Sequence, residues 1–267
     1  GGPAYYIEKA MGQKWYAWIF AVTTIIATGL LLPGVQSNSI GNAAELAFGG
    51  ETVVNFFGDS ISATKMTTAV IVVSVLGFII FGGVKRIAHF TQIVVPFMAL
   101  GYIVMALGVI AFHIGDLPKI IALIVADAFT PMAGVGAAIG WGVKRGVYSN
   151  EAGQGTGPHA ASASEVEHPA QQGLVQAFSV YVDTLFVCSA TAFMILITNQ
   201  YYVTGVEVVS SGGVLSNDIQ SNSPAYTQYA LETVLVGFGK TFVAVALYFF
   251  AFTTILAYYY IAETTVS

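Results

Sequence analysis

Long apolar stretches alternate with short polar segments along this chain. A helix that crosses the hydrocarbon core of a bilayer needs about 20 mostly apolar residues. We expect about six such helices, at approximately 14–46, 66–82, 91–114, 126–146, 171–198 and 240–262. The pattern predicts an all-α membrane protein in which residues 1–267 form a single transmembrane domain.

Glycine and proline interrupt the fourth expected span. Pro131 lacks a backbone N–H, and Gly134, Gly136 and Gly140 weaken a helix. Broken helix survives in lipid only where it lines a cavity or is buried in protein. We therefore expect a discontinuous helix whose free N–H and C=O ends suit a zwitterion and a cation. A kinked helix that packs through its small residues explains the same pattern.

Composition agrees with a membrane protein. The chain is 56% hydrophobic and only 9% charged, whereas a soluble domain carries about 25% charged residues. Its net charge of -5 argues against a nucleic-acid partner, which would require basic patches. With the N-terminal end placed in the cytoplasm, the positive-inside rule is satisfied, because most Lys and Arg residues fall in inner segments: Lys9, Lys14, Lys85, Arg86, Lys144 and Arg145.

Polar side chains inside the expected spans are candidates for binding. Among those of "GVQSNSIGN", residues 34–42, we place Gln36 toward a cavity and expect the others to bond between helices. Asp183 lies inside the fifth span, and an intramembrane acid is a functional candidate by default. The alternative that we favour is a position near the inner mouth, bonded to a loop. Asp127 is expected to cap the start of the broken helix or to face a substrate amine.

The stretch "RGVYSNEAGQGTGPHA", residues 145–160, is polar between two apolar regions. The positive-inside count places it on the cytoplasmic side. The alternating Gly153, Gly155 and Gly157 permit a tight return of the chain. Asn150 and Glu151 are expected to cap backbone groups and to brace an inner gate, although capping without gating explains them equally well. We call the following residues the cytoplasmic motif: Ser149, Asn150, Glu151, Gly153 and Gly155.

An internal echo links the first and sixth spans. "FAVTTIIA" at 20–27 and "FAFTTILA" at 250–257 are identical at six of eight positions. Two spans five apart run in opposite directions, so an inverted repeat of five helices would produce this pairing. Chance similarity between two apolar helices is the alternative. The sequence shows no nucleophile–base arrangement, and we do not expect an enzyme.

Several segments are similar to the alanine or glycine:cation symporter family. They are "GGPAYYIEKAMG", "VQSNSI", "FGGVKRIAHFTQIVVPFMAL", "GVKRGVYSNEAGQGTGPHAASASEVEHPAQQGLV", "DTLFVCSATAFMIL" and "FAFTTILAYYY". The resemblance extends along the whole chain. It implies sodium-coupled or proton-coupled uptake of small neutral amino acids across the cell membrane by a multi-pass protein. It also implies a five-plus-five inverted-repeat fold of the leucine-transporter type.

The resemblance also assigns individual residues. Thr253 and Thr254 match the family's inner sodium-site helix, which makes them candidate ligands of the co-transported sodium ion. The implied substrate contacts are Gln36, Asp127, Phe129, Thr130 and Tyr258. Many relatives have Trp where this chain has Tyr258, so the pocket is expected to differ there.

We interpret the chain as a fragment of a longer protein, because it starts without methionine and stops directly after an apolar run. In the implied fold it corresponds to the third through eighth helices. The N- and C-terminal helices of the parent would then be missing partners, and the chain alone is not expected to transport. The alternatives are a transporter of the same fold that couples to protons or takes another substrate, a non-transporting membrane component, and an inactive truncated fragment.

Overall fold

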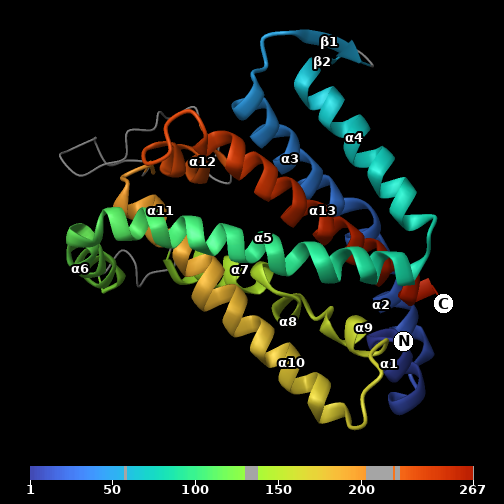
Figure 1. The fold of residues 1–267 in the computed structure, drawn as a ribbon. Coiled ribbons are helices and arrows are strands. Elements are labelled where there is room, and N and C mark those ends of the chain that lie inside the picture. The colour runs from blue at the N-terminus through green and yellow to red at the C-terminus, as the bar shows by residue number, and fades with distance from the viewer. Residues whose placement is uncertain (57–58, 130–137, 203–218, 220–222, 267) are drawn as a thin grey trace. The chain divides into compact units, whose positions relative to one another are not determined.

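The structure is a computed structural model that describes residues 1–267 except 57–58, 130–137, 203–218, 220–222 and 267. Helices make up most of it (Figure 1). The chain divides into two compact units. Unit 1 comprises Gly1–Leu31, Asp116–Ser189 and Tyr258–Ser267, and unit 2 comprises Leu32–Gly115 and Ala190–Ala257. Each unit is described separately.

Within the described residues, five helices are long and apolar enough to cross a bilayer. They span Lys14–Phe48, Ala63–Ile80, Lys85–Phe112, Pro169–Ile197 and Gly239–Val266, and each overlaps one of the expected spans. The remaining expected span, 126–146, includes residues 130–137, which lie outside the described part. Helices α6 (Leu117–Ala128) and α7 (Ala138–Ser149) flank that segment.

Unit 1 holds most of the shorter helices. In chain order they are α1 (Pro3–Met11), α2 (Lys14–Ile26), η1 (Ala27–Leu31), α6, α7, α8 (Glu151–Gln154), α9 (Gly157–Ala161), α10 (Pro169–Tyr181) and η4 (Val182–Cys188). The end of α13 (Gly239–Val266) completes this unit. Gly12 ends α1 in the left-handed conformation that glycine adopts most easily, at φ 66°.

Two π-helical turns, η1 and η4, interrupt long helices. Pro33 follows η1 by two residues and explains it, because proline removes one N–H donor and crowds the carbonyl four residues earlier. No proline lies within η4, whose sequence is "VDTLFVC". Single π turns are frequent at functional sites, and η4 contains the intramembrane acid Asp183.

Unit 2 contains α3 (Leu32–Phe48), α4 (Ala63–Ile80), α5 (Val84–Phe112), α11 (Ser189–Ile197), α12 (Ala225–Glu232) and most of α13, and the short η2 (Ile114–Asp116) begins at its boundary. A hairpin joins α3 to α4 (Figure 1). Its strands β1 (Val53–Phe56) and β2 (Asp59–Ser62) pair antiparallel, from Val53 opposite Ser62 to Phe56 opposite Asp59. The all-helical prediction missed this hairpin, although the β-branched pair at 53–54 favours a strand.

Helix α13 is the most buried of the five long helices. Phe252 is fully buried there, and its ring contacts Phe90 of α5 edge-on with centroids 5.8 Å apart. Phe250 meets Tyr102 of α5 in the same way at 5.7 Å. The Tyr102 hydroxyl in turn lies 2.6 Å from Thr191 Oγ1 of α11. Each aromatic pair contributes about 0.5–1.5 kcal/mol beyond its buried area, so two aromatic contacts anchor α13 to α5.

The N-terminal end of α13 is fixed to α12 by two polar side chains. Gln228 is fully buried, and its amide donates to the carbonyls of Ala43 and Lys240 at 2.9 and 3.1 Å. Glu232 accepts from the backbone N–H groups of Gly237 and Lys240 at 2.6 and 2.9 Å. Desolvation alone would raise the pKa of Glu232, but these donors outweigh it and lower the pKa.

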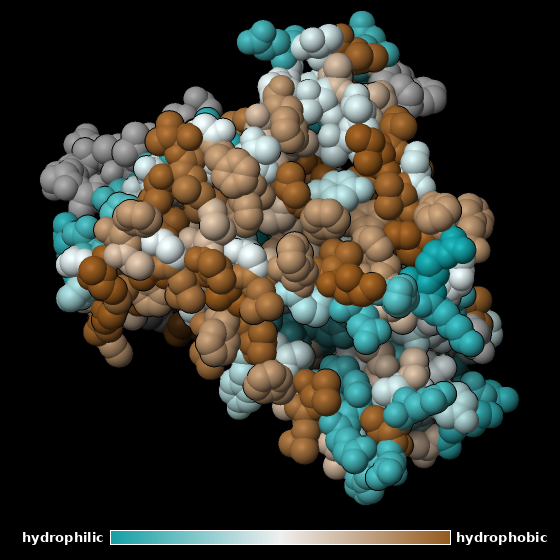
Figure 2. All heavy atoms as spheres, in the orientation of Figure 1, coloured by the Kyte–Doolittle hydropathy of each residue, from teal (hydrophilic) through white to brown (hydrophobic). Residues whose placement is uncertain are grey.

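Large apolar side chains remain exposed along the long helices, among them Trp18, Phe78, Phe97 and Leu174. Figure 2 shows such hydrophobic residues over much of the face in view. A protein in water rarely leaves contiguous apolar patches of this kind. Such a surface suits the hydrocarbon core of a membrane.

Candidate substrate and cation sites

The cytoplasmic motif extends from the last residue of α7 through the very short helix α8 to the glycine that ends it. Asn150 caps α8, because its side-chain Oδ1 accepts from the N–H of Ala152 at 2.9 Å. Glu151 is the first residue of α8, and burial raises the pKa of its carboxyl group. The motif thus places one capping amide beside one carboxyl group that the protein partly withdraws from water.

Two glycines of the motif are required for different reasons. A Cβ atom on Gly153 would come within 2.5 Å of the backbone oxygen of Val147, a distance at which the backbone itself would have to move. Gly155 has open space around it but ends α8 at φ 76°, in the left-handed region. The tight return expected from the sequence therefore depends on close approach at Gly153 and on backbone conformation at Gly155.

Gln154 connects this motif to the predicted substrate residue Tyr258. Its amide donates to the carbonyl of Tyr148 at 2.9 Å and to the hydroxyl of Tyr258 at 3.5 Å. Tyr258 is 4% exposed. The sequence interpretation did not single out Gln154. Its position between two glycines was the available signal, because glycines let a neighbouring side chain turn inward.

Ser149, the last residue of α7, lies beside the π turn η4. Its hydroxyl donates to Asp183 Oδ2 at 2.6 Å and lies 3.3 Å from Cys188 Sγ. Sequence reasoning placed Asp183 either in a functional site or near the inner mouth and bonded to a loop. Its partner Ser149 belongs to the end of helix α7 rather than to a loop, and the position of Asp183 relative to the membrane stays a prediction.

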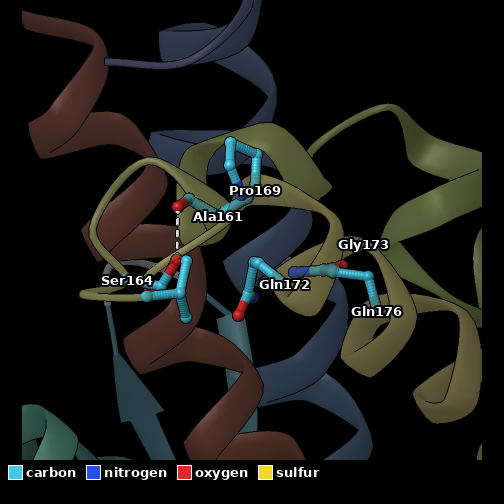
Figure 3. A pocket seen from close by; sticks show the side chains of 7 residues that line it. Ala161, Ser164, Pro169, Gln172, Gly173 and Gln176 are labelled. Carbon is cyan, nitrogen blue, oxygen red and sulfur yellow. Dashed lines mark hydrogen bonds between the residues drawn. The ribbon is translucent and has the colours of Figure 1, made fainter.

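A pocket of about 390 Å³ opens between the turn after α9 and the start of α10 (Figure 3). Its polar lining comes mainly from Ser164, Gln172 and Gln176. Ser164 donates across its rim to the carbonyl of Ala161 at 2.7 Å. None of the residues assigned from the sequence lines this pocket, so it is separate from the candidate sites.

The candidate sodium ligands Thr253 and Thr254 lie in α13 within unit 2. The Thr253 hydroxyl donates to the carbonyls of Phe249 and Phe250 at 2.9 and 3.0 Å. The Thr254 hydroxyl donates to the carbonyl of Phe250 at 2.8 Å. Threonines in membrane helices commonly bond back in this way. The hydroxyl oxygens keep lone pairs that a hard cation accepts.

Thr23 in the first span bonds back to its own helix in the same way as Thr253. Thr23 corresponds to Thr253 in the internal echo, and its hydroxyl donates to the carbonyls of Ile19 and Phe20, both at 2.9 Å. Thr253 likewise reaches the carbonyls three and four residues earlier. The likeness between the two segments therefore includes local hydrogen bonding as well as residue types.

The predicted substrate residues have different surroundings. Gln36 is half-buried in α3 of unit 2. Asp127 and Phe129 are exposed at the end of α6 in unit 1, and Thr130 lies outside the described residues. The expectation that Asp127 caps the start of a helix is wrong. Asp127 occupies the last turn of α6, which begins at Leu117, where Pro118 has the fixed φ that suits the first turn of a helix.

The assigned residues are divided between the two units. Asp127, Phe129, Tyr258 and the cytoplasmic motif belong to unit 1, and Gln36, Thr253 and Thr254 belong to unit 2. Within unit 1, the structure joins Tyr258 to the motif through Gln154. The two candidate cation ligands share one turn of α13 within unit 2.

Comparison with known proteins gives one family for the whole chain. The sodium:alanine symporter family matches residues 1–267. The chain belongs to this family. It is 54% identical to "Putative sodium/proton-dependent alanine carrier protein YrbD" of Bacillus subtilis (strain 168), over 100% of the chain and 53% of that protein.

Other members of the sodium:alanine symporter family are also similar. A "Sodium/proton-dependent alanine carrier protein" of Bacillus sp. (strain PS3) is 48% identical over 91% of the chain and 52% of its own length. "Probable sodium/glutamine symporter GlnT" of Bacillus subtilis (strain 168) is 38% identical over 100% of the chain and 51% of its own length. The chain therefore spans about half the length of the curated relatives that it matches.

Family membership and the long apolar helices together identify a multi-pass protein of the cell membrane. The members named above are carriers and symporters rather than enzymes. The family resemblance that the motifs predicted is confirmed. The inverted-repeat fold and the individual site residues remain predictions.

Proposed function

We propose that the gene product carrying residues 1–267 is a secondary active transporter that couples entry of a small neutral amino acid, alanine or glycine, to inward movement of sodium. The observation that carries this proposal is the family match along the whole chain, together with a 54% identical relative whose name specifies alanine. The names of relatives include protons beside sodium. Sodium as the coupling ion is therefore the part that most needs a test.

The chemistry of α13 supports a sodium ion as cargo. Sodium loses its water only where hard oxygen ligands replace it, and Thr hydroxyls with backbone carbonyls are ligands of this kind. Thr253 is almost fully buried and Thr254 is half-buried. One hydroxyl oxygen of this pair and a neighbouring carbonyl would provide part of the coordination shell, and other segments of the protein would complete it.

The end of α6 supports an amino-acid substrate. The carbonyl end of a helix carries partial negative charge, and Asp127 adds a carboxylate in the last turn. This combination attracts a cationic group such as the α-ammonium group of an amino acid. We propose that Asp127 and Phe129 line the substrate path with Thr130, and that Gln36 and Tyr258 contribute polar contacts.

We also propose a five-plus-five inverted repeat with a discontinuous helix at 126–146. Support comes from the echo between 20–27 and 250–257 and from the equivalent bonding of Thr23 and Thr253. In such folds, substrate and ion sites lie where discontinuous helices meet near the middle of the bilayer.

Uptake into proteoliposomes tests the function directly. The purified gene product should accumulate labelled alanine or glycine under an inward sodium gradient, and excess unlabelled substrate should abolish the signal. Replacing sodium with choline should remove uptake. Equal uptake under a proton gradient alone would contradict sodium coupling, and uptake of glutamine in place of both amino acids would contradict the substrate class.

Whether residues 1–267 suffice for transport is a separate question. Our prediction is that further helices are needed, because the implied fold takes part of its substrate and sodium contacts from outside these residues. Reconstituting residues 1–267 alone beside the complete gene product tests it. Equal uptake by both proteins would contradict this prediction.

A further inference from the structure

His159 is fully buried in α9, although it lies in a polar segment outside the long helices. Its ring stacks on Phe20 of α2 with centroids 6.5 Å apart. Gly2 lies so close that a Cβ atom there would come within 2.6 Å of the ring. The backbone oxygen of Thr156 and the hydroxyl of Thr265 lie within hydrogen-bond distance of the two ring nitrogens. Four separate segments of unit 1 therefore enclose one titratable side chain.

The hydrogen bonds define the protonation of the neutral ring. Nδ1 lies 3.1 Å from the backbone oxygen of Thr156. A carbonyl oxygen only accepts, so Nδ1 must carry a hydrogen. In the neutral ring, Nε2 then has a free lone pair, and it accepts from the Thr265 hydroxyl 3.1 Å away. This assignment of the tautomer follows from the network.

Thr265 can serve a protonated ring equally well. Its hydroxyl lies 2.7 Å from the carbonyl of Ile261 as well as 3.1 Å from Nε2. When a proton from water adds to the Nε2 lone pair, the ring becomes the donor to Thr265 Oγ1. The hydroxyl hydrogen then turns to Ile261. Both protonation states keep a partner on each ring nitrogen, so proton uptake costs no hydrogen bond.

Burial opposes the positive charge. Desolvation lowers the pKa of His159, and this effect outweighs the Thr156 carbonyl, which raises the pKa. No carboxylate is among the causes of the shift. The titratable groups on α1, α2 and the end of α13 are Tyr5, Tyr6, Glu8, Lys9, Lys14, Tyr16, Tyr258, Tyr259, Tyr260 and Glu263.

We propose that His159 is a proton-binding site whose neutral form holds α9 against the end of α13 and whose protonation weakens this arrangement, because the positive charge is then enclosed away from water. Because its pKa is lowered in the folded protein, the buried arrangement is most stable above the unfolded pKa of about 6.5. It loses stability as the pH falls below that value. The site thus makes the segment that contains the cytoplasmic motif sensitive to acid, whatever amino acid the protein carries.

Hydrogen exchange of the complete gene product in nanodiscs tests this proposal. Protection factors, corrected for the intrinsic pH dependence of exchange, should fall at least tenfold for residues 156–162 between pH 7.5 and pH 5. His159→Gln should remove this pH dependence. His168→Gln is the matched control, because His168 is exposed nearby, and it should leave the response intact.

Thr265→Val provides a second variant that keeps the ring. It removes the acceptor that a protonated Nε2 needs, so the midpoint of the exchange response should move to lower pH by about one unit. The proposal is wrong if wild-type protection is equal at both pH values, if His159→Gln keeps the response, if His168→Gln abolishes it or if Thr265→Val leaves the midpoint unchanged. None of these readouts requires transport, so they are independent of the proposed function.

Discussion

The hydroxyl of Ser149 donates a 2.6 Å hydrogen bond to the carboxylate of Asp183 and so joins the end of α7 to the π turn η4. A carboxyl group inside an apolar helix needs such a partner, because hydrocarbon offers it no hydrogen bond. The widened turn also lets Ser189 donate to the carbonyl of Thr184 five residues earlier, at 3.0 Å. The hydrogen bond therefore joins the start of the cytoplasmic motif to the π turn of this span.

Ser149→Ala should lower the thermal stability of the protein in detergent. The change removes a charge-assisted hydrogen bond, but the pair is exposed, so we expect a loss of about 1 kcal/mol. Ser179→Ala is the control, because its hydroxyl donates only within α10, to the carbonyl of Gln176 at 2.7 Å. If the two variants lose the same stability, the contact between α7 and η4 contributes nothing of its own.

Alanine should be tolerated very differently at Gly153 and Gly155. Gly153→Ala places a methyl group against the backbone of Val147, so we expect poor folding and little recoverable protein. Gly155→Ala meets no atoms within 4 Å and should cost about 1 kcal/mol for the left-handed conformation. Gly140→Ala, also in open space, is the control. The yield of monodisperse protein measures how well each variant is tolerated. Equal yields from Gly153→Ala and Gly155→Ala would contradict the prediction.

Glu151 should make the protein less stable as the pH rises. Burial raises its pKa, so the folded state binds the proton more tightly than the unfolded state does. The stabilisation is complete below about pH 4.3, the unfolded pKa, and is lost as the pH rises through the folded pKa. Glu151→Gln should therefore melt at a higher temperature than the wild type at pH 7. This advantage should vanish near pH 4.

Measuring uptake by Glu151→Gln separates gating from capping. If Glu151 braces an inner gate, the variant should transport less while being more stable. Unchanged uptake would assign Glu151 a local structural role beside the cap that Asn150 makes. A variant that melts below the wild type at pH 7 would contradict the burial argument itself.

Hydropathy predicted the long helices well, because a long apolar stretch such as 240–262 is stable only in lipid or in a protein core. Local irregularities were harder to predict. The π turn η1 depends on where Pro33 falls within a helix that otherwise reads as continuous. The strands at 53–56 and 59–62 are too short to give a clear periodic signal.

The candidate sites were predictable only in part. The glycines of the cytoplasmic motif signalled a tight turn, and the structure gives a separate physical reason at Gly153 and at Gly155. Contacts between distant segments left no such signal. The bonds of Gln154 to Tyr258 and of His159 to Thr265 join residues more than 100 positions apart. Only the fold brings these pairs together.

The two threonines of α13 provide the sharpest test of the cation site. Valine keeps the shape of threonine and removes the hydroxyl, so Thr253→Val and Thr254→Val each remove one potential oxygen ligand. If one of these hydroxyls binds sodium, its variant should raise the sodium concentration for half-maximal uptake about tenfold or more, roughly 1.4 kcal/mol. Substrate affinity at saturating sodium should change much less. Serine at the same position keeps the oxygen and should restore sodium dependence.

Thr264→Val controls for the loss of a back-bonded hydroxyl in the same helix. The Thr264 hydroxyl donates to the carbonyls of Tyr260 and Ile261 at 3.0 and 3.1 Å. Thr253 likewise donates to the carbonyls three and four residues before it. A purely local hydrogen bond stabilises the helix slightly without affecting ion binding, so this variant should keep wild-type sodium dependence. If Thr253→Val and Thr254→Val both fold normally and behave like Thr264→Val, the hydroxyls of α13 serve only their own helix. The sodium ligands must then lie elsewhere in the protein.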